Sequence, residues 1–86
     1  MREYAQPITL KAAAEHFGRS WTSVRDWPAR YNARRLTTPQ VLGSRRVYYD
    51  LVDLSTIDAH LHMGKRVPKT PELRDEYRER LRATAA

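Results

Sequence analysis

The chain contains no cysteine, and for a fold of 86 residues this is the tightest constraint that the sequence sets. A domain of this size buries only about 60% of the surface that its unfolded chain exposes. Disulfides and thiolate-bound metals, which often reinforce such thin cores, are excluded. The three histidines are scattered, so we expect no metal site and no cofactor. Stability has to come from one small, well-packed core.

Positive charge is concentrated in the first half of the chain. The net charge is +6, with nine basic and three acidic residues in 1–49 and seven of each in 50–86. Such an asymmetry is typical of a surface that binds an anionic partner, most often a nucleic acid in proteins this small. No apolar run approaches the roughly 18 residues that a membrane span needs. We therefore expect a soluble, intracellular protein with no membrane contact.

The first part of the chain predicts two short helices separated by a glycine turn. Apolar residues within 10–17 recur at i, i+3, i+4 and i+7, which indicates a helix with one buried face. Thr9 is placed to cap this helix and Gly18 to end it in the left-handed conformation. Ser20 then caps a second helix. Pro28 must stop or restart that helix, which leaves a helical turn or a structured loop up to residue 35.

The second part predicts a hairpin and two further helices. Residues 40–49 hold two β-rich runs on either side of Gly43-Ser44-Arg45, which is typical of a hairpin. Asp50 and Asp53 match a capping box that would open a helix ending near Met63. Thr70, followed by proline, opens a last helix.

Two short helices, a basic hairpin and a packing helix follow the order of a winged helix-turn-helix. Ala14 has to be small where the second helix crosses the first, Gly18 supplies the positive φ, and Val24 fills the angle between the helices. We expect a mainly α fold with a small β-hairpin. Its expected parts are an extended N-terminal arm over 1–7, a winged helix-turn-helix DNA-binding domain over 8–64, a linker over 65–70 and a C-terminal helix over 71–86.

Residues 9–27, TLKAAAEHFGRSWTSVRDW, resemble the opening of the excisionase and MerR-like winged-helix superfamily. Residues 45–61, RRVYYDLVDLSTIDAHL, are similar to the wing strand of that family and the helix after it. The resemblance covers residues 8–63. The chain departs from the family pattern at three positions, which are Ala12, Arg19 and Pro28, so family contacts are not carried over beyond Trp27.

Two branches of this superfamily are compared with the length and charge of this chain, and the excisionases fit better than the MerR-like sensors. MerR-like sensors add a dimerising coiled coil and an effector pocket, for which residues 71–86 are too few. Phage excisionases, also called recombination directionality factors, are small and basic, and they bend DNA so that integrase can excise a prophage. The resemblance implies an excisionase, located in the cytoplasm of a bacterial host and associated with the nucleoid. Its implied partners are double-stranded DNA near phage attachment sites, phage integrase and neighbouring copies of itself. No small-molecule ligand is expected.

The alternative is a small MerR-like phage or host transcriptional regulator without an effector domain. The Arg- and Ala-rich composition is typical of an actinobacterial phage, such as a mycobacteriophage.

The second helix is the expected reading element. Arg25 is expected to contact a guanine edge, with a phosphate contact or an ion pair with Asp26 as the alternatives. Ser20 serves as a cap, holds a phosphate, or does both. Trp21 packs on a sugar-phosphate edge or lies at the margin of the core. One of Arg45 and Arg46, at the hairpin, is expected to enter the minor groove, because neighbouring strand residues point to opposite faces; a solvated hairpin tip is the alternative. The full set of expected DNA-binding residues is Arg19, Ser20, Trp21, Thr22, Arg25, Arg30, Arg34, Arg35, Arg45 and Arg46.

The last helix carries a narrow apolar stripe formed by Leu73, Tyr77 and Leu81. Sixteen residues are marginal for an isolated helix, so this stripe should pack on something. The hypothesis is a contact with a neighbouring copy or with integrase, and packing on its own domain is the alternative.

We expect no enzymatic activity. A metal-dependent nuclease would need clustered carboxylates, and Asp50, Asp53 and Asp58 lie close together in the sequence. Helix capping accounts for the first two, and an exposed helix face accounts for the third.

Overall fold

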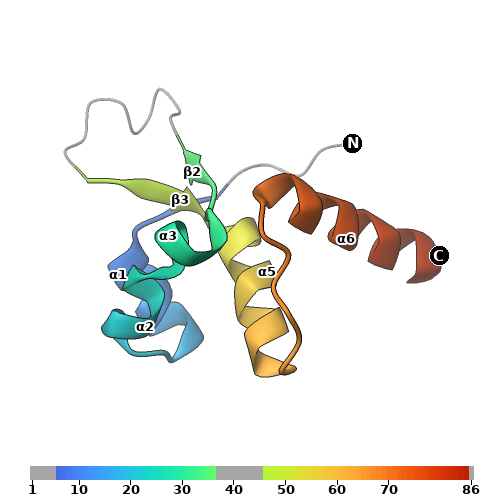
Figure 1. Cartoon of the computed structure of the whole chain (residues 1–86). Coiled ribbons are helices and arrows are strands. Elements are labelled where there is room, and N and C mark those ends of the chain that lie inside the picture. The colour runs from blue at the N-terminus through green and yellow to red at the C-terminus, as the bar shows by residue number, and fades with distance from the viewer. Residues whose placement is uncertain (1–5, 37–45, 86) are drawn as a thin grey trace.

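The computed structural model describes residues 6–36 and 46–85. Helices make up 63% of these residues and a small antiparallel sheet completes the fold, which confirms the mainly helical class. Figure 1 shows α1, α2 and α3 on one side of α5 and α6 on the other. The elements are β1 (Pro7–Ile8), α1 (Leu10–Phe17), α2 (Trp21–Arg25), α3 (Trp27–Tyr31), β2 (Arg35–Leu36), β3 (Tyr48–Asp50), α5 (Leu51–His62) and α6 (Pro71–Ala85).

Local capping sets the first two helices, as the sequence predicts. The Thr9 Oγ1 accepts a hydrogen bond from the Ala12 N–H at 3.2 Å and begins α1. Gly18 ends α1 with a φ of 65°, in the left-handed region that glycine adopts without steric cost. The Ser20 Oγ accepts from the Ser23 N–H at 3.3 Å and begins α2.

Pro28 restarts the helical path. It lies in the first turn of α3, where its missing N–H leaves no intrahelical bond unmade. The helix ends at Asn32, whose φ of 53° is left-handed and turns the chain toward β2. The segment up to residue 35, predicted as a helical turn or loop, is therefore helical only to Tyr31 and ends in a strand.

The sheet has the strand order β1-β3-β2, and both pairings are antiparallel. Strand β2 begins at Arg35, earlier than the predicted first strand of the hairpin, and it pairs with Tyr48 and Tyr49 of β3. The predicted turn at residues 43–45 lies outside the described residues. The sequence did not predict β1, because two residues are too few to show the alternation that marks a strand.

The core lies where α1, α2, α3 and α5 meet. Ala13, Val24, Leu54 and Ile57 have no exposed surface, and Trp27 is 2% exposed. The expected helix faces therefore do form the core. Connecting segments contribute as well, and Val67 is one of the buried residues. Because Val67 belongs to 65–70, the segment predicted as a linker is held against the core at this point.

Asp53 does not complete a capping box, which corrects the sequence prediction. Asp50 caps α5 as expected, since its Oδ1 accepts from the Val52 N–H at 3.1 Å. The capping-box geometry would turn the Asp53 carboxylate back to the N–H of Asp50, but that N–H donates to the Arg34 carbonyl at 2.9 Å. Asp53 is instead fully buried and pairs with Arg74 of α6.

Candidate nucleic-acid interface

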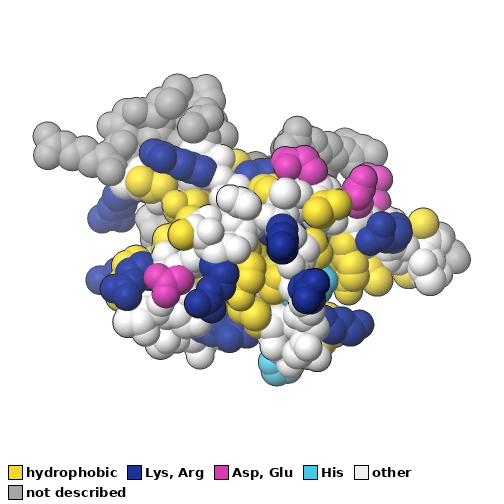
Figure 2. All heavy atoms as spheres, in the orientation of Figure 1, with side chains coloured by type: hydrophobic (Ala, Val, Ile, Leu, Met, Phe, Trp, Pro, Cys, Tyr) yellow, Lys and Arg dark blue, Asp and Glu magenta, His cyan; other side chains and the backbone are white. Residues whose placement is uncertain are grey.

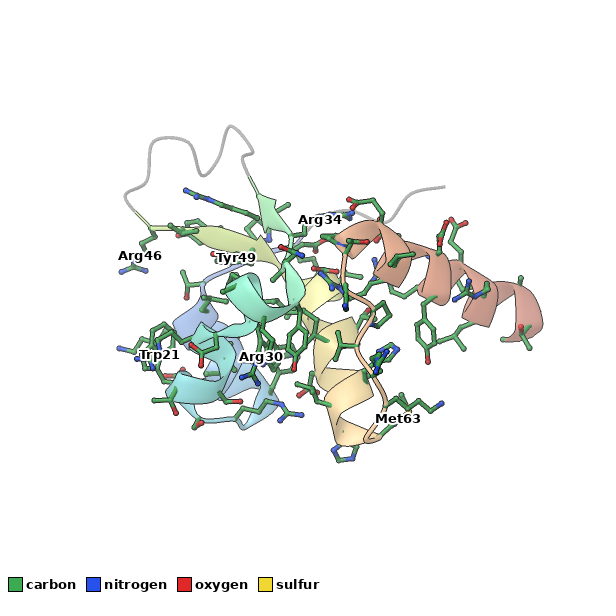
Figure 3. All side chains as sticks on the ribbon, viewed as in Figure 1. Trp21, Arg30, Arg34, Arg46, Tyr49 and Met63 are labelled. Atoms are coloured by element: carbon green, nitrogen blue, oxygen red, sulfur yellow. The ribbon has the colours of Figure 1, made fainter. Side chains whose placement is uncertain are left out.

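The outward face of α2 is polar and exposed, as predicted. Ser20, Trp21 and Thr22 are all exposed, whereas Val24 on the opposite face is fully buried. The hydroxyl of Ser20 is occupied as the helix cap and also lies 3.3 Å from that of Thr22. Trp21 is 47% exposed, so it lies outside the core, and Figure 3 shows it at the edge of the molecule.

Arg25 has one weak partner. Its Nε lies 3.7 Å from the Asp26 Oδ1, and both side chains are more than half exposed. An ion pair this exposed contributes little, so Arg25 can exchange Asp26 for a phosphate or a base edge at small cost.

Arg30 on α3 and Arg35 on β2 are both exposed. Among the residues that the structure describes, neither has an ion-pair partner. Arg46 is exposed just before β3 and lies at the same edge of the molecule as Trp21 in Figure 3. Arg45 lies outside the described residues. The cations of α3 and β2 are thus available to an anionic ligand.

Arg19, one of the expected DNA-binding residues, is turned inward. Its Nε donates to the Asp58 Oδ1 in a very short contact, and its Nη2 lies 3.4 Å from the Asp58 carbonyl oxygen. The guanidinium carbon also lies 5.7 Å from the centroid of the Trp27 ring, within the range of a cation–π contact. Arg19 therefore joins the turn between α1 and α2 to α5.

Arg34 is likewise engaged within the protein. Its Nη2 lies 2.9 Å from the Asp75 Oδ2 and 3.4 Å from the Glu72 Oε2, so it points at the first turns of α6 (Figure 3). Burial acts to lower the pKa of Arg34, but the hydrogen bond and charge of Asp75 outweigh it and raise this pKa above its ordinary value. Arg34, one of the expected DNA-binding residues, thus joins the segment just before β2 to α6 through an ion pair.

Few acids accompany the cations of α2, α3 and the strands. Between Glu15 and Asp50 the chain carries seven arginines and one acid, Asp26. In Figure 2, Lys and Arg side chains lie over this region and also over α5 and α6, whereas Asp and Glu lie mainly over the first part of α6. Because two of those acids pair with Arg34, the surface of α2, α3 and β2 keeps its positive charge.

The predicted apolar stripe of α6 divides into two environments. Tyr77 packs on α5, with its ring centroid 4.5 Å from that of His60. Leu73 and Leu81 are 46% and 51% exposed. The alternative that the helix packs on its own domain thus describes Tyr77, whereas Leu73 and Leu81 remain exposed.

Arg74, which sequence reasoning missed, is what holds α6 in place. It is fully buried, with its Nε 2.6 Å and its Nη2 2.8 Å from the two carboxylate oxygens of Asp53. In the sequence it is one of several arginines among acids on a charged helix, and no local signal distinguishes it. Asp53 was explained by capping, so its need for a buried partner was not recognised.

None of the described helices combines the length and apolarity needed to cross a membrane. Within residues 6–36 and 46–85, no three His, Asp or Glu side chains are grouped so that they could share a metal ion.

Comparisons with protein-family models, with curated proteins and with solved structures found no match.

Proposed function

We propose that the chain binds double-stranded DNA through the surface of α2, α3 and β2. The observation that carries this proposal is the pairing pattern of the arginines. Arg19, Arg34 and Arg74 are held by internal acids, whereas Arg25 is weakly paired and Arg30 and Arg35 are exposed without an ion-pair partner among the described residues. Exposed cations on one face, with few acids nearby, attract the phosphate backbone.

The arrangement of elements supports a winged helix-turn-helix docking. Helix α2 follows α1 after a three-residue turn and presents Trp21, Thr22 and Arg25 outward. In such proteins the second helix enters the major groove. Strands β2 and β3 with Arg46, which we call the wing, would then bring Arg35 and Arg46 to the adjacent backbone and minor groove.

We further propose that DNA binding serves excision, as an excisionase that bends DNA beside phage attachment sites for integrase. The support is the resemblance of residues 9–27 and 45–61 to the excisionase and MerR-like superfamily. The described chain adds one helix, α6, to this core, and α6 is docked on α5. Cytoplasmic location, integrase and neighbouring copies as partners, and the absence of catalysis belong to the same proposal.

Mobility-shift titrations with a random duplex and with DNA flanking phage attachment sites test the proposal. Four cations reaching phosphates (Arg25, Arg30, Arg35 and Arg46) predict a slope of log K against log salt of about −3.6, at about 0.9 per phosphate. A slope shallower than about −2 would contradict this interface. Footprints confined to promoters rather than attachment sites would favour the transcriptional regulator.

A further inference from the structure

The Arg74 guanidinium is saturated with acceptors. Its Nε and Nη2 donate to the two Asp53 oxygens at 2.6 and 2.8 Å, and its Nη1 donates to the carbonyls of Tyr31 and Pro68 at 2.8 and 2.7 Å. The Nη2 also donates to the Asn32 carbonyl at 3.2 Å. All five N–H groups of a buried arginine are thus used. Any other arrangement of these partners would leave a buried polar group unpaired.

Two of these partners, the carbonyls of Tyr31 and Asn32, belong to the connection between α3 and β2. Tyr31 is the last residue of α3, and Asn32 takes the left-handed conformation that turns the chain. The next bonds continue the same anchoring, because the Arg34 N–H donates to the Asp53 Oδ2 at 2.8 Å and the Arg34 carbonyl accepts from the Asp50 N–H at 2.9 Å. The path from α3 into β2 is therefore fastened to α5 and α6 residue by residue.

Few strand pairings between described residues join β2 to the sheet. Among the described residues, β2 pairs with β3 through Arg35–Tyr49 and Leu36–Tyr48. In the three-stranded sheet β2 lies at an edge, with β3 as its neighbour. The direction in which β2 leaves the core thus depends on the anchored turn before it.

We propose that Arg74, together with Asp53, is a positioning residue for DNA binding, which sets the orientation of the wing relative to α2. Helix α6 is in this way part of the DNA-binding unit, although its own side chains need not touch DNA. This inference rests on the proposed function, because it makes Arg74 responsible for placing Arg35 where it contacts DNA.

The test is a double-mutant cycle that separates the wing from α2. Arg74→Lys keeps a positive charge beside Asp53 but replaces a planar fork of five donors with three donors on a single nitrogen. Arg35→Ala reports on the wing and Arg25→Ala reports on α2, each measured in the unaltered chain and in the Arg74→Lys background. Binding to a random duplex is followed by fluorescence anisotropy at several salt concentrations, below the unfolding transition of every variant. Arg80→Lys, an exposed change on the same helix, is the matched control.

In the unaltered chain and in the Arg80→Lys control, Arg35→Ala should weaken binding about tenfold and reduce the salt slope by about 0.9. In the Arg74→Lys background it should weaken binding by less than about twofold, because the wing no longer presents Arg35. Arg25→Ala should have the same effect in both backgrounds. This selective loss is a readout that general destabilisation would not produce.

An Arg35→Ala effect of equal size in both backgrounds, zero included, would overturn the inference, as would a parallel loss of the Arg25→Ala effect. Failure of the unaltered chain to bind DNA would remove the proposed function and this inference with it. If Arg74→Lys does not fold, the cycle is repeated with Asp53→Leu and Arg74→Met combined, which removes the same anchoring without leaving a buried charge.

Discussion

Truncation of Arg74 to alanine should cost a large part of the stability of this protein. The change leaves the Asp53 carboxylate, which has no exposed surface, with the Arg34 N–H as its remaining hydrogen-bond donor among the described residues. Removing one partner of a buried ion pair typically costs about 3–5 kcal/mol. At about 0.05–0.15 kcal/mol per residue, a chain of this length has only about 4–13 kcal/mol in total. Arg74→Ala should therefore lower the free energy of unfolding by about a quarter or more.

Urea unfolding followed by tryptophan fluorescence and by far-UV circular dichroism measures this loss. Trp27 is 2% exposed and should report the loss of the core, whereas Trp21 is already exposed in the folded protein. We expect a lower midpoint with an unchanged m-value, which would show that stability rather than the mechanism of unfolding has changed. Arg80→Ala, an exposed change on the same helix, should stay within about 0.5 kcal/mol of the unaltered chain.

A loss of unfolding free energy smaller than about 1 kcal/mol for Arg74→Ala would refute the reasoning, because removing this buried guanidinium takes a hydrogen-bond donor away from each of its buried acceptors. Replacing both partners, with Asp53→Leu and Arg74→Met, should recover part of the lost stability, since no unpaired charge is then left in the core, whereas the carbonyls of Tyr31, Asn32 and Pro68 still lose their donor.

Arg30→Ala should weaken binding to random duplex DNA about tenfold and leave the urea midpoint unchanged, because Arg30 is exposed. Arg34→Ala should do the opposite, because Arg34 is paired with Asp75: it should lower the free energy of unfolding by about 0.5–1 kcal/mol and keep the affinity for DNA within about twofold. Equal losses of affinity for the two variants would contradict the assignment of Arg30 to the DNA surface and of Arg34 to an internal ion pair. Ending the chain after Lys69 removes the partner of Asp53, so circular dichroism should show a largely unfolded chain. A folded residue 1–69 fragment would show that α6 is dispensable.

The sequence by itself determined the short-range features of this protein. The caps at Thr9, Ser20 and Thr70 and the left-handed Gly18 are found where the sequence predicts them. Each of these features involves atoms no more than a few residues apart, so the residue types and their spacing suffice to specify them. The mainly helical class follows from the same local signals together with the apolar periodicity.

Only the tertiary structure decided which arginines are available to a ligand. Arg19, Arg34 and Arg74 find their acids 39, 41 and 21 residues away along the chain. In the sequence these three resemble Arg30 and Arg35, because composition and charge asymmetry record how many cations a segment holds and not what lies opposite each one. The same is true of β1, whose two residues become a strand only because β3 offers an open edge beside them. Ion pairs and strand pairings between distant segments form only where the fold brings those segments together. No local pattern in a single sequence specifies which distant segments will meet.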